Sequence, residues 1–359
     1  EVTCGDTFDP NGLAMAIENY RYIERPRIVD NDGDAFRVLQ GLRGQSGDWD
    51  WEVAGVFSKA NKDDITRNRI SNTLMQQALN DPTPAAYNPF AAGVLESNID
   101  RALIDVYRES ESSLAMVDFK FSNAELFEMP AGPAGVLIGY EWRRESFEDD
   151  RDDRLDGTIA FVDRDGDTYP EISDVMNSSP TPDGKGRRTT NSVFAELQLP
   201  LHETLDVQAA VRYENFDDVG DTTVGKLAFG WRPVDQLLVR GSWSEAFRAP
   251  NMVTINEEFI ARAGTRNDWA CFYAANEGGL DADDFSDCDY SVQRQATGSE
   301  DLKPETSTNS SVGIVIEPLE GLTITLDYWA IEKKDVIGLT GRENHMYYDL
   351  VLRLQSGIG

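Results

Sequence analysis

Four aspartates in one acidic stretch are the residues whose types and spacing best suit metal chemistry. DRDGDTYPEISD, residues 163–174, has aspartate at the first, third, fifth and twelfth positions of a calcium-binding loop: Asp163, Asp165, Asp167 and Asp174. Thr168 stands where such loops carry glycine, Pro170 interrupts the pattern, and no flanking helices are evident. Calcium would neutralise this crowded loop, but a solvated acidic loop without metal is the favoured interpretation.

Two cysteines bracket a short polar stretch. CFYAANEGGLDADDFSDC runs from Cys271 to Cys288, and its length and composition favour a disulfide that closes a loop, with two free thiols as the alternative. A disulfide implies an oxidising compartment. Cys4 would then be left over, and a partner upstream of residue 1 would explain it.

Catalysis has little support, and we expect no enzyme and no cofactor beyond the calcium considered above. His202 and His345 lie in no Ser/His/Asp or metal-ligand arrangement. GDTTVGK, residues 220–226, has most of a phosphate-binding loop, but Leu227 follows where Ser or Thr should bind magnesium. The stretch also lies between two alternating strands, so we reject a nucleotide site.

Composition excludes several other classes. The 359 residues carry 33 Lys+Arg against 64 Asp+Glu, a formal net charge of -31, which excludes nucleic acid as a partner. No apolar run approaches the roughly 18 residues of a membrane helix. A membrane β-barrel stays open, because its strands alternate and keep mean hydropathy low.

The elements that must position these residues are strands. Strict alternation of apolar and polar side chains is the dominant pattern, as in TLDVQAAVRYENF, where Leu205, Val207, Ala209 and Val211 share one face. The pattern predicts about eleven strands: 14–24, 34–44, 48–60, 113–128, 134–147, 188–200, 204–216, 222–233, 236–246, 305–317 and 321–333.

Short and longer connections alternate between these strands. In an up-and-down meander, every second connection lies at the same end of the strands. A barrel that spans a membrane can therefore have short turns at one end and long loops at the other. The sequence therefore predicts an all-β fold, an up-and-down antiparallel transmembrane β-barrel. Its long outer loops should carry short helices at 71–81, 97–110 and 342–357.

Two motifs resemble those of the TonB-dependent outer-membrane receptors. GWRPVDQLLVRGSWSEAFRAPN, residues 230–251, is similar to a strand pair of that family that ends in F-R-A-P. GSEDLKPETSTNSSVGI, residues 298–314, is similar to its N-P-x-L-K-P-E-T segment, with Ser299 and Glu300 in place of Asn and Pro. Residues 34–58 and 177–186 also resemble the family, and the likeness spans roughly residues 15–340.

The resemblance implies a 22-stranded barrel plugged by an N-terminal domain that contacts a TonB complex. We expect residues 1–359 to form part of one such barrel, about 11 of 22 strands, with both ends cut and the plug domain absent. The implied function is active uptake of a scarce nutrient, a ferric siderophore or another bulky ligand such as a carbohydrate or peptide. The alternatives are a passive porin-like channel and a surface adhesin. The implied location is the outer membrane of a Gram-negative cell, in contact with its lipid.

Ligand contacts are expected in the long outer loops 61–112, 148–187 and 247–304. Within the last of these, three aromatic side chains could stack on a ligand, with the disulfide holding them: Trp269, Phe272 and Tyr273. The alternative is that they only pack the small core of their own loop. Three arginines on polar strand faces should point inward and either guide an anion or pair with carboxylates: Arg212, Arg232 and Arg240. The acidic outer loops disfavour anionic ligands by repulsion.

Overall fold

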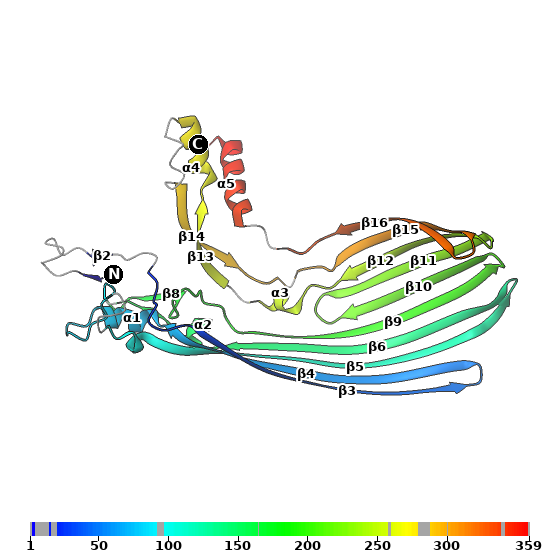
Figure 1. The fold of residues 1–359 in the computed structure, drawn as a ribbon, viewed down its shortest axis with the longest axis horizontal. Coiled ribbons are helices and arrows are strands. Elements are labelled where there is room, and N and C mark those ends of the chain that lie inside the picture. The colour runs from blue at the N-terminus through cyan, green and yellow to red at the C-terminus, as the bar shows by residue number, and fades with distance from the viewer. Residues whose placement is uncertain are drawn as a thin grey trace.

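The computed structural model is dominated by one antiparallel sheet (Figure 1). Ten strands follow one another in the order β16-β15-β12-β11-β10-β9-β6-β5-β4-β3, so neighbours in the chain are neighbours in the sheet. The structure describes residues 2–3, 14–15, 20–91, 97–163, 165–257, 260–278, 288–299, 301–338 and 342–357. Within this part of the chain, β3 and β16 form the two edges of an open sheet. The predicted meander is confirmed.

The ten strands are long. Their bounds are β3 Ile28–Ser46, β4 Trp49–Ile70, β5 Leu103–Met129, β6 Gly132–Arg151, β9 Gly184–His202, β10 Leu205–Phe216, β11 Gly220–Val234, β12 Leu237–Arg248, β15 Glu305–Leu319 and β16 Leu322–Lys334. Ten of the eleven predicted strands correspond to these. The first five are longer than predicted at the end that leads into the long connections, because cross-strand pairing continues after the apolar alternation stops.

The strand predicted at residues 14–24 is wrong. Only Ala14–Met15 is a strand, β2, and it pairs with β1, Val2–Thr3, outside the large sheet. Residues 16–19 lie outside the described part, and residues 20–24 form no strand. The alternating Tyr20 and Tyr22 instead pack with each other, with ring centroids 4.8 Å apart, and Tyr22 packs on the small core of a connection.

Connection length sorts by end of the sheet, as predicted, except that the connection from β10 to β11, residues 217–219, is short although it lies at the same end as the long ones. Turns of two residues join β3 to β4, β5 to β6, β9 to β10, β11 to β12 and β15 to β16, all at one end of Figure 1. Gly47 (φ 60°) and Gly321 (φ 84°) supply the positive φ that such tight turns need. The connections 71–102, 152–183 and 249–304 gather at the opposite end, which we call the long-connection end.

The two faces of the sheet differ in polarity. Cross-strand pairing puts Phe119, Tyr140, Val193 and Tyr213 in one row, and each is between 38% and 55% exposed. The opposite face carries ion pairs, among them Arg240 with Asp327, at 2.8 Å from Nη2 to Oδ2. Arg212 pairs there with Glu141 and Glu214. One face of the sheet therefore carries an apolar band, which gives way to charged residues toward the long-connection end, where Lys59 pairs with Glu111. The opposite face is polar.

Short elements fill the long connections. The helices are α1 Asn72–Leu79, η1 Ile99–Ala102, α2 Asp153–Asp156, α3 Met252–Asn256, α4 Trp269–Gly278 and α5 Arg342–Ser356. The long connections also contain two small hairpins, β7 Ala160–Val162 with β8 Thr168–Ser173, and β13 Ile260–Asn267 with β14 Asp289–Ala296. No helix in the described residues has both the length and the apolar character needed to cross a membrane.

The predicted loop helices at 71–81 and 342–357 are confirmed by α1 and α5. The prediction at 97–110 is wrong beyond its first turn. A single 3-10 turn ends at Ala102, and β5 begins at Leu103, which pairs with Ile70 of β4. Pairing along β4 outweighs the weak helical periodicity of this segment.

Candidate ligand-binding region at the long-connection end

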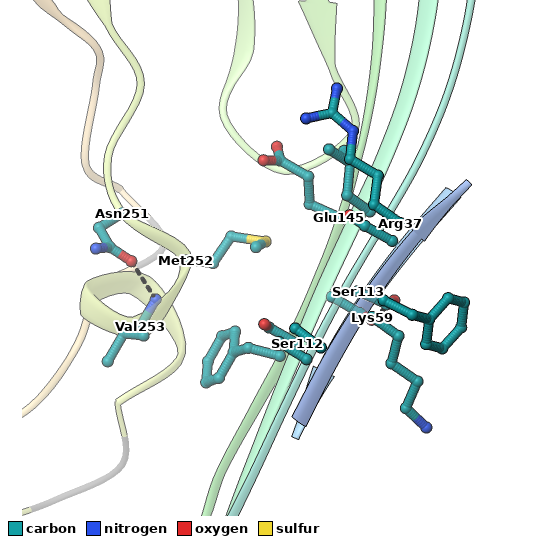
Figure 2. Close-up of a pocket in the computed structure, with 15 residues that line it drawn as sticks. Arg37, Lys59, Ser112, Ser113, Glu145, Asn251, Met252 and Val253 are labelled. Atoms are coloured by element: carbon teal, nitrogen blue, oxygen red, sulfur yellow. Dashed lines mark hydrogen bonds between the residues drawn. The ribbon is translucent and has the colours of Figure 1, made fainter. Parts of the chain in front are cut away.

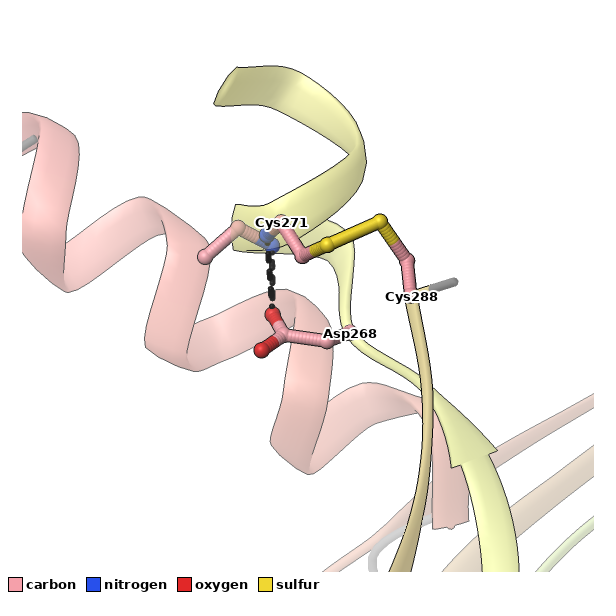
Figure 3. Close-up of a disulfide and its surroundings, with 4 residues drawn as sticks. Asp268, Cys271 and Cys288 are labelled. Atoms are coloured by element: carbon pink, nitrogen blue, oxygen red, sulfur yellow. Dashed lines mark hydrogen bonds between the residues drawn. A yellow bond between two sulfur atoms is a disulfide. The ribbon is translucent and has the colours of Figure 1, made fainter. Parts of the chain in front are cut away.

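The predicted disulfide joins Cys271 and Cys288, with Cα atoms 5.6 Å apart (Figure 3). Cys271 lies in the first turn of α4, and Asp268 Oδ1 caps that turn by accepting from the backbone N–H groups of Ala270 and Cys271. The Asp268 N–H in turn donates to the Cys288 carbonyl at 2.7 Å. The bridge and this bond fix the start of α4 to the start of β14. Cys4 lies outside the described residues.

The three aromatic candidates divide into two packed rings and one exposed ring. Trp269 meets Phe272 edge-on at 6.0 Å between centroids and meets Tyr347 of α5 at 6.4 Å. Trp269 and Phe272 are half-buried, whereas Tyr273 is 43% exposed. Tyr347 lies 78 positions from Trp269 in the chain, so no local sequence pattern predicts that it joins this cluster. Ligand stacking by these rings stays a prediction.

The acidic stretch does not gather its four aspartates. Asp163 organises the turn between β7 and β8, where its Oδ1 accepts from the N–H groups of Asp165 and Asp167, both at 2.9 Å. Its Oδ2 accepts from the Tyr169 hydroxyl at 2.9 Å. Burial raises the pKa of Asp163, but these backbone and hydroxyl donors outweigh burial and hold the pKa below its usual range.

Asp174 belongs to a different structure. It is 2% exposed, its Oδ2 accepts from Ser71 Oγ at 2.8 Å, and its Oδ1 accepts from the Thr73 N–H at 2.9 Å. Arg154 Nε lies 3.3 Å from Oδ2. This carboxylate therefore anchors the N-terminus of α1. Across the described ranges, no group of three or more His, Cys, Asp or Glu could hold a metal ion, and calcium binding stays a prediction.

A cluster that sequence reasoning missed holds the longest connection to the sheet. Arg188 of β9, 6% exposed, pairs with Asp218 at 2.8 Å and donates to the Pro250 carbonyl at 2.8 Å. The ring of Phe216 lies 5.6 Å from the Arg188 guanidinium. A doubled arginine at the start of a strand was the only local signal.

A cavity of about 530 Å³ lies between α3 and the polar face of β3 to β6 (Figure 2). Asn251 begins α3 and its Oδ1 accepts from the Val253 N–H at 2.9 Å. Met252 points from α3 toward the strands. By register, Arg37, Ser112 and Glu145 belong to the polar face of the sheet. The arrangement offers mixed charge and hydroxyl groups below a short helix, and it has no catalytic constellation.

A family model described as TonB dependent receptor-like, beta-barrel, matches residues 5–348. The chain belongs to this family, whose members are outer-membrane receptors and transporters rather than enzymes. No curated protein matches the sequence.

Solved structures with a similar fold include the siderophore receptor PirA from Acinetobacter baumannii, at 18% identity and a TM-score of 0.53, over 85% of this chain and 35% of that one. A mutant of the ferric enterobactin receptor PfeA from Pseudomonas aeruginosa has 15% identity and a TM-score of 0.41, over 86% and 52%. The RagAB peptide importer has 11% identity and a TM-score of 0.45, over 86% and 30%. The likeness to PirA shows the fold alone. The chain spans about a third to a half of the length of these structures.

Proposed function

We propose that residues 1–359 form part of the barrel domain of a receptor that takes up a scarce nutrient across the outer membrane of a Gram-negative cell. The energy comes from a TonB complex that contacts the plug domain of the full-length receptor. The nutrient is a ferric siderophore or a ligand of similar bulk, such as an oligosaccharide or a peptide.

The observation that carries this proposal is the sorting of the connections. Every turn at one end has two residues, whereas three connections at the opposite end build helices, hairpins, a disulfide and small cores of their own. A passive pore does not require structured binding elements at one mouth. Loops fixed on a rigid scaffold are where receptors hold their ligand-binding residues.

Polar and apolar faces support the same assignment. The apolar row through Phe119 and Tyr140 meets lipid, while the paired Arg240 and Asp327 line the interior. The cavity under α3 lies on that interior face. A ligand released from the long-connection end therefore meets a polar path along the sheet.

The test uses the full-length receptor in cells that lack other uptake routes for iron. Accumulation of labelled ferric siderophores, oligosaccharides or peptides is measured in cells with and without TonB. We expect one ligand class to accumulate only when both the receptor and TonB are present. Accumulation that is independent of TonB would identify a passive channel, and surface binding without accumulation would identify an adhesin.

A further inference from the structure

A second cavity at the long-connection end has a charge opposite to that of the chain. It measures about 360 Å³ and lies between the segment before β3, the ends of β4 and β5, and the connection from β6 to β9. Its lining includes four arginines and no carboxylate residue: Arg21, Arg25, Arg27 and Arg69. Three of the four come from one short run, residues 21–27, in a chain with 64 acidic and 33 basic residues. We call it the arginine cavity.

Most of this positive charge is not neutralised within the protein. Arg25 pairs with Asp100 at 3.1 Å, but Arg69 donates only to neutral groups, the Met176 carbonyl at 2.8 Å and Ser178 Oγ at 3.1 Å. Among the contacts of the described residues, Arg21 and Arg27 have no ion-pair partner. Like charges gathered in one cavity repel one another, and a bound anion relieves that repulsion.

The walls of the arginine cavity are firmly built. Asn68 Nδ2 donates to the Pro26 carbonyl at 2.8 Å and ties the segment before β3 to β4. The Met176 N–H donates to the Ile70 carbonyl at 2.8 Å and ties in the connection from β6. Tyr87, 3% exposed, donates to Glu24 at 2.7 Å. Three connections distant in the chain are thus held around one hollow.

Backbone strain is concentrated at the same place. In the described residues, three non-glycine positions have positive φ, and two of them line the arginine cavity: Asn68 at 59° and Asn177 at 57°. Residues in this conformation cluster at ligand sites, where the surrounding structure holds them. The strain and the unneutralised charge are independent observations of one site.

The charge continues into a neighbouring cavity of about 290 Å³. Arg27 and Arg69 line both cavities, and the second adds Arg108 and Arg151. These two arginines share the carboxylate of Asp149, and Asp64 also lines this second cavity. Guanidinium groups therefore extend from the arginine cavity to the polar face of the sheet, where carboxylates accompany them.

We propose that the arginine cavity binds an anionic oxygen-bearing group, a carboxylate or a phosphate, of the ligand. Guanidinium forks hold such groups through two parallel N–H bonds, which explains arginine rather than lysine at all four positions. The inference rests on the proposed uptake function, because it assigns a charge to the nutrient. It reverses the expectation from composition that acidic outer loops disfavour anionic ligands, because the local charge of the arginine cavity differs in sign from the net charge of the chain.

The test titrates two probes, citrate for carboxylates and inorganic pyrophosphate for phosphates, into the purified full-length receptor by calorimetry. We expect saturable binding of at least one probe and none of uncharged sucrose. Arg21→Gln/Arg27→Gln should weaken that binding about tenfold or more, because glutamine cannot replace the charge-assisted hydrogen bonds of the two guanidinium groups. The probe that binds identifies the group.

The matched control, Arg232→Gln/Arg353→Gln, removes the same charge from an exposed residue near a short turn and an exposed residue of α5, both outside the arginine cavity. Its affinity should stay within about twofold of wild type, because distant surface charges are screened by salt. Equal weakening in both double variants would reduce the effect to general electrostatics and overturn the proposal. Wild-type receptor that binds neither probe would also overturn it, whether or not the variants assemble.

These outcomes are separable from the proposed function. TonB-dependent uptake without anion binding would overturn the arginine cavity as a site and leave uptake standing. Anion binding without TonB-dependent uptake would overturn uptake and leave the cavity as an anion site.

Discussion

Arg248, the last residue of β12, and Glu305, the first residue of β15, lie directly opposite each other and pair at 2.7 Å between Nη2 and Oε1. The two motifs that first indicated the family meet in this pair, although 56 residues separate them in the chain. Glu305 Oε1 also accepts from the Ile337 N–H at 2.7 Å. The Glu305 carboxylate thus joins the two ends of the connection 249–304 and also binds the segment that follows β16.

Replacing Glu305 with alanine should loosen the connection 249–304, because Arg248 and the Ile337 N–H both lose their acceptor. We expect faster cleavage of that connection by an added protease, with the barrel still assembled. Asp349→Ala, which removes the ion pair of Asp349 with Arg353 on α5, serves as the control and should leave the cleavage rate unchanged. Equal rates for wild type and Glu305→Ala would contradict the role of this pair.

Gly298 should tolerate no side chain. A Cβ there would overlap the carbonyl oxygens of Thr254 and Ile255, while the Gly298 N–H donates to the Glu257 carbonyl at 2.7 Å. Gly298→Ala should destabilise the packing of α3 by about 1–3 kcal/mol, as overpacked sites do. Gly338→Ala is the matched control, because open space surrounds that position. Hydrogen exchange at α3 measures the difference, and identical protection in the two variants would refute the overlap.

The ten sheet strands could be predicted because each is set by its own alternating residues. In β10, for example, Leu205, Val207 and Ala209 point to one face whatever lies beyond the neighbouring strands. Tyr20 and Tyr22 show the same alternation yet form no strand, because their partners come from a connection core around Tyr87. Local pattern cannot distinguish these two cases.

The binding region was less accessible to sequence reasoning. The disulfide was predictable from spacing, whereas the contact of Arg188 with Pro250 depends on how two strands place a connection. Arg27 and Arg69 become neighbours only when β3 and β4 pair. The net charge of -31 for the whole chain gave no indication that the arginine cavity is locally positive.

Removing the disulfide should increase the motion of α4 without preventing barrel assembly. Cys271→Ser/Cys288→Ser lets 16 intervening residues sample more conformations, and we expect a loss of up to about 3 kcal/mol in the local stability of this unit. Mass spectrometry of envelope protein should first show the wild-type pair oxidised. Rapid labelling of both thiols in wild-type protein without reductant would contradict the bridge.

Asp174 should be a structural residue. Asp174→Ala leaves the Ser71 hydroxyl, the Thr73 N–H and Arg154 without their acceptor. Hydrogen exchange of the α1 amides should reveal a loss of about 1–3 kcal/mol in local stability. Glu171→Ala, an exposed acid on β8, is the control and should change nothing. An unchanged α1 in Asp174→Ala would show that another contact fixes the helix.

Calcium binding can be tested separately from that role. If the turn holds calcium, Asp165→Asn/Asp167→Asn should weaken its binding to the full-length receptor in a calorimetric titration. Asp174→Asn should leave it unchanged, since Asp174 is engaged with Ser71 and Arg154. No calcium-dependent heat in the wild type would establish the turn as a solvated acidic loop.

The most direct test of the account is ligand binding after deletion of residues 265–290 from the full-length receptor. This segment carries Trp269, Phe272, Tyr273 and the disulfide, and it extends from a hairpin outside the large sheet. We predict that the barrel still assembles, with heat-modifiable gel mobility, and that binding of the transported ligand is abolished. Unchanged ligand affinity in the assembled deletion variant would show that this connection is architecture rather than the binding site.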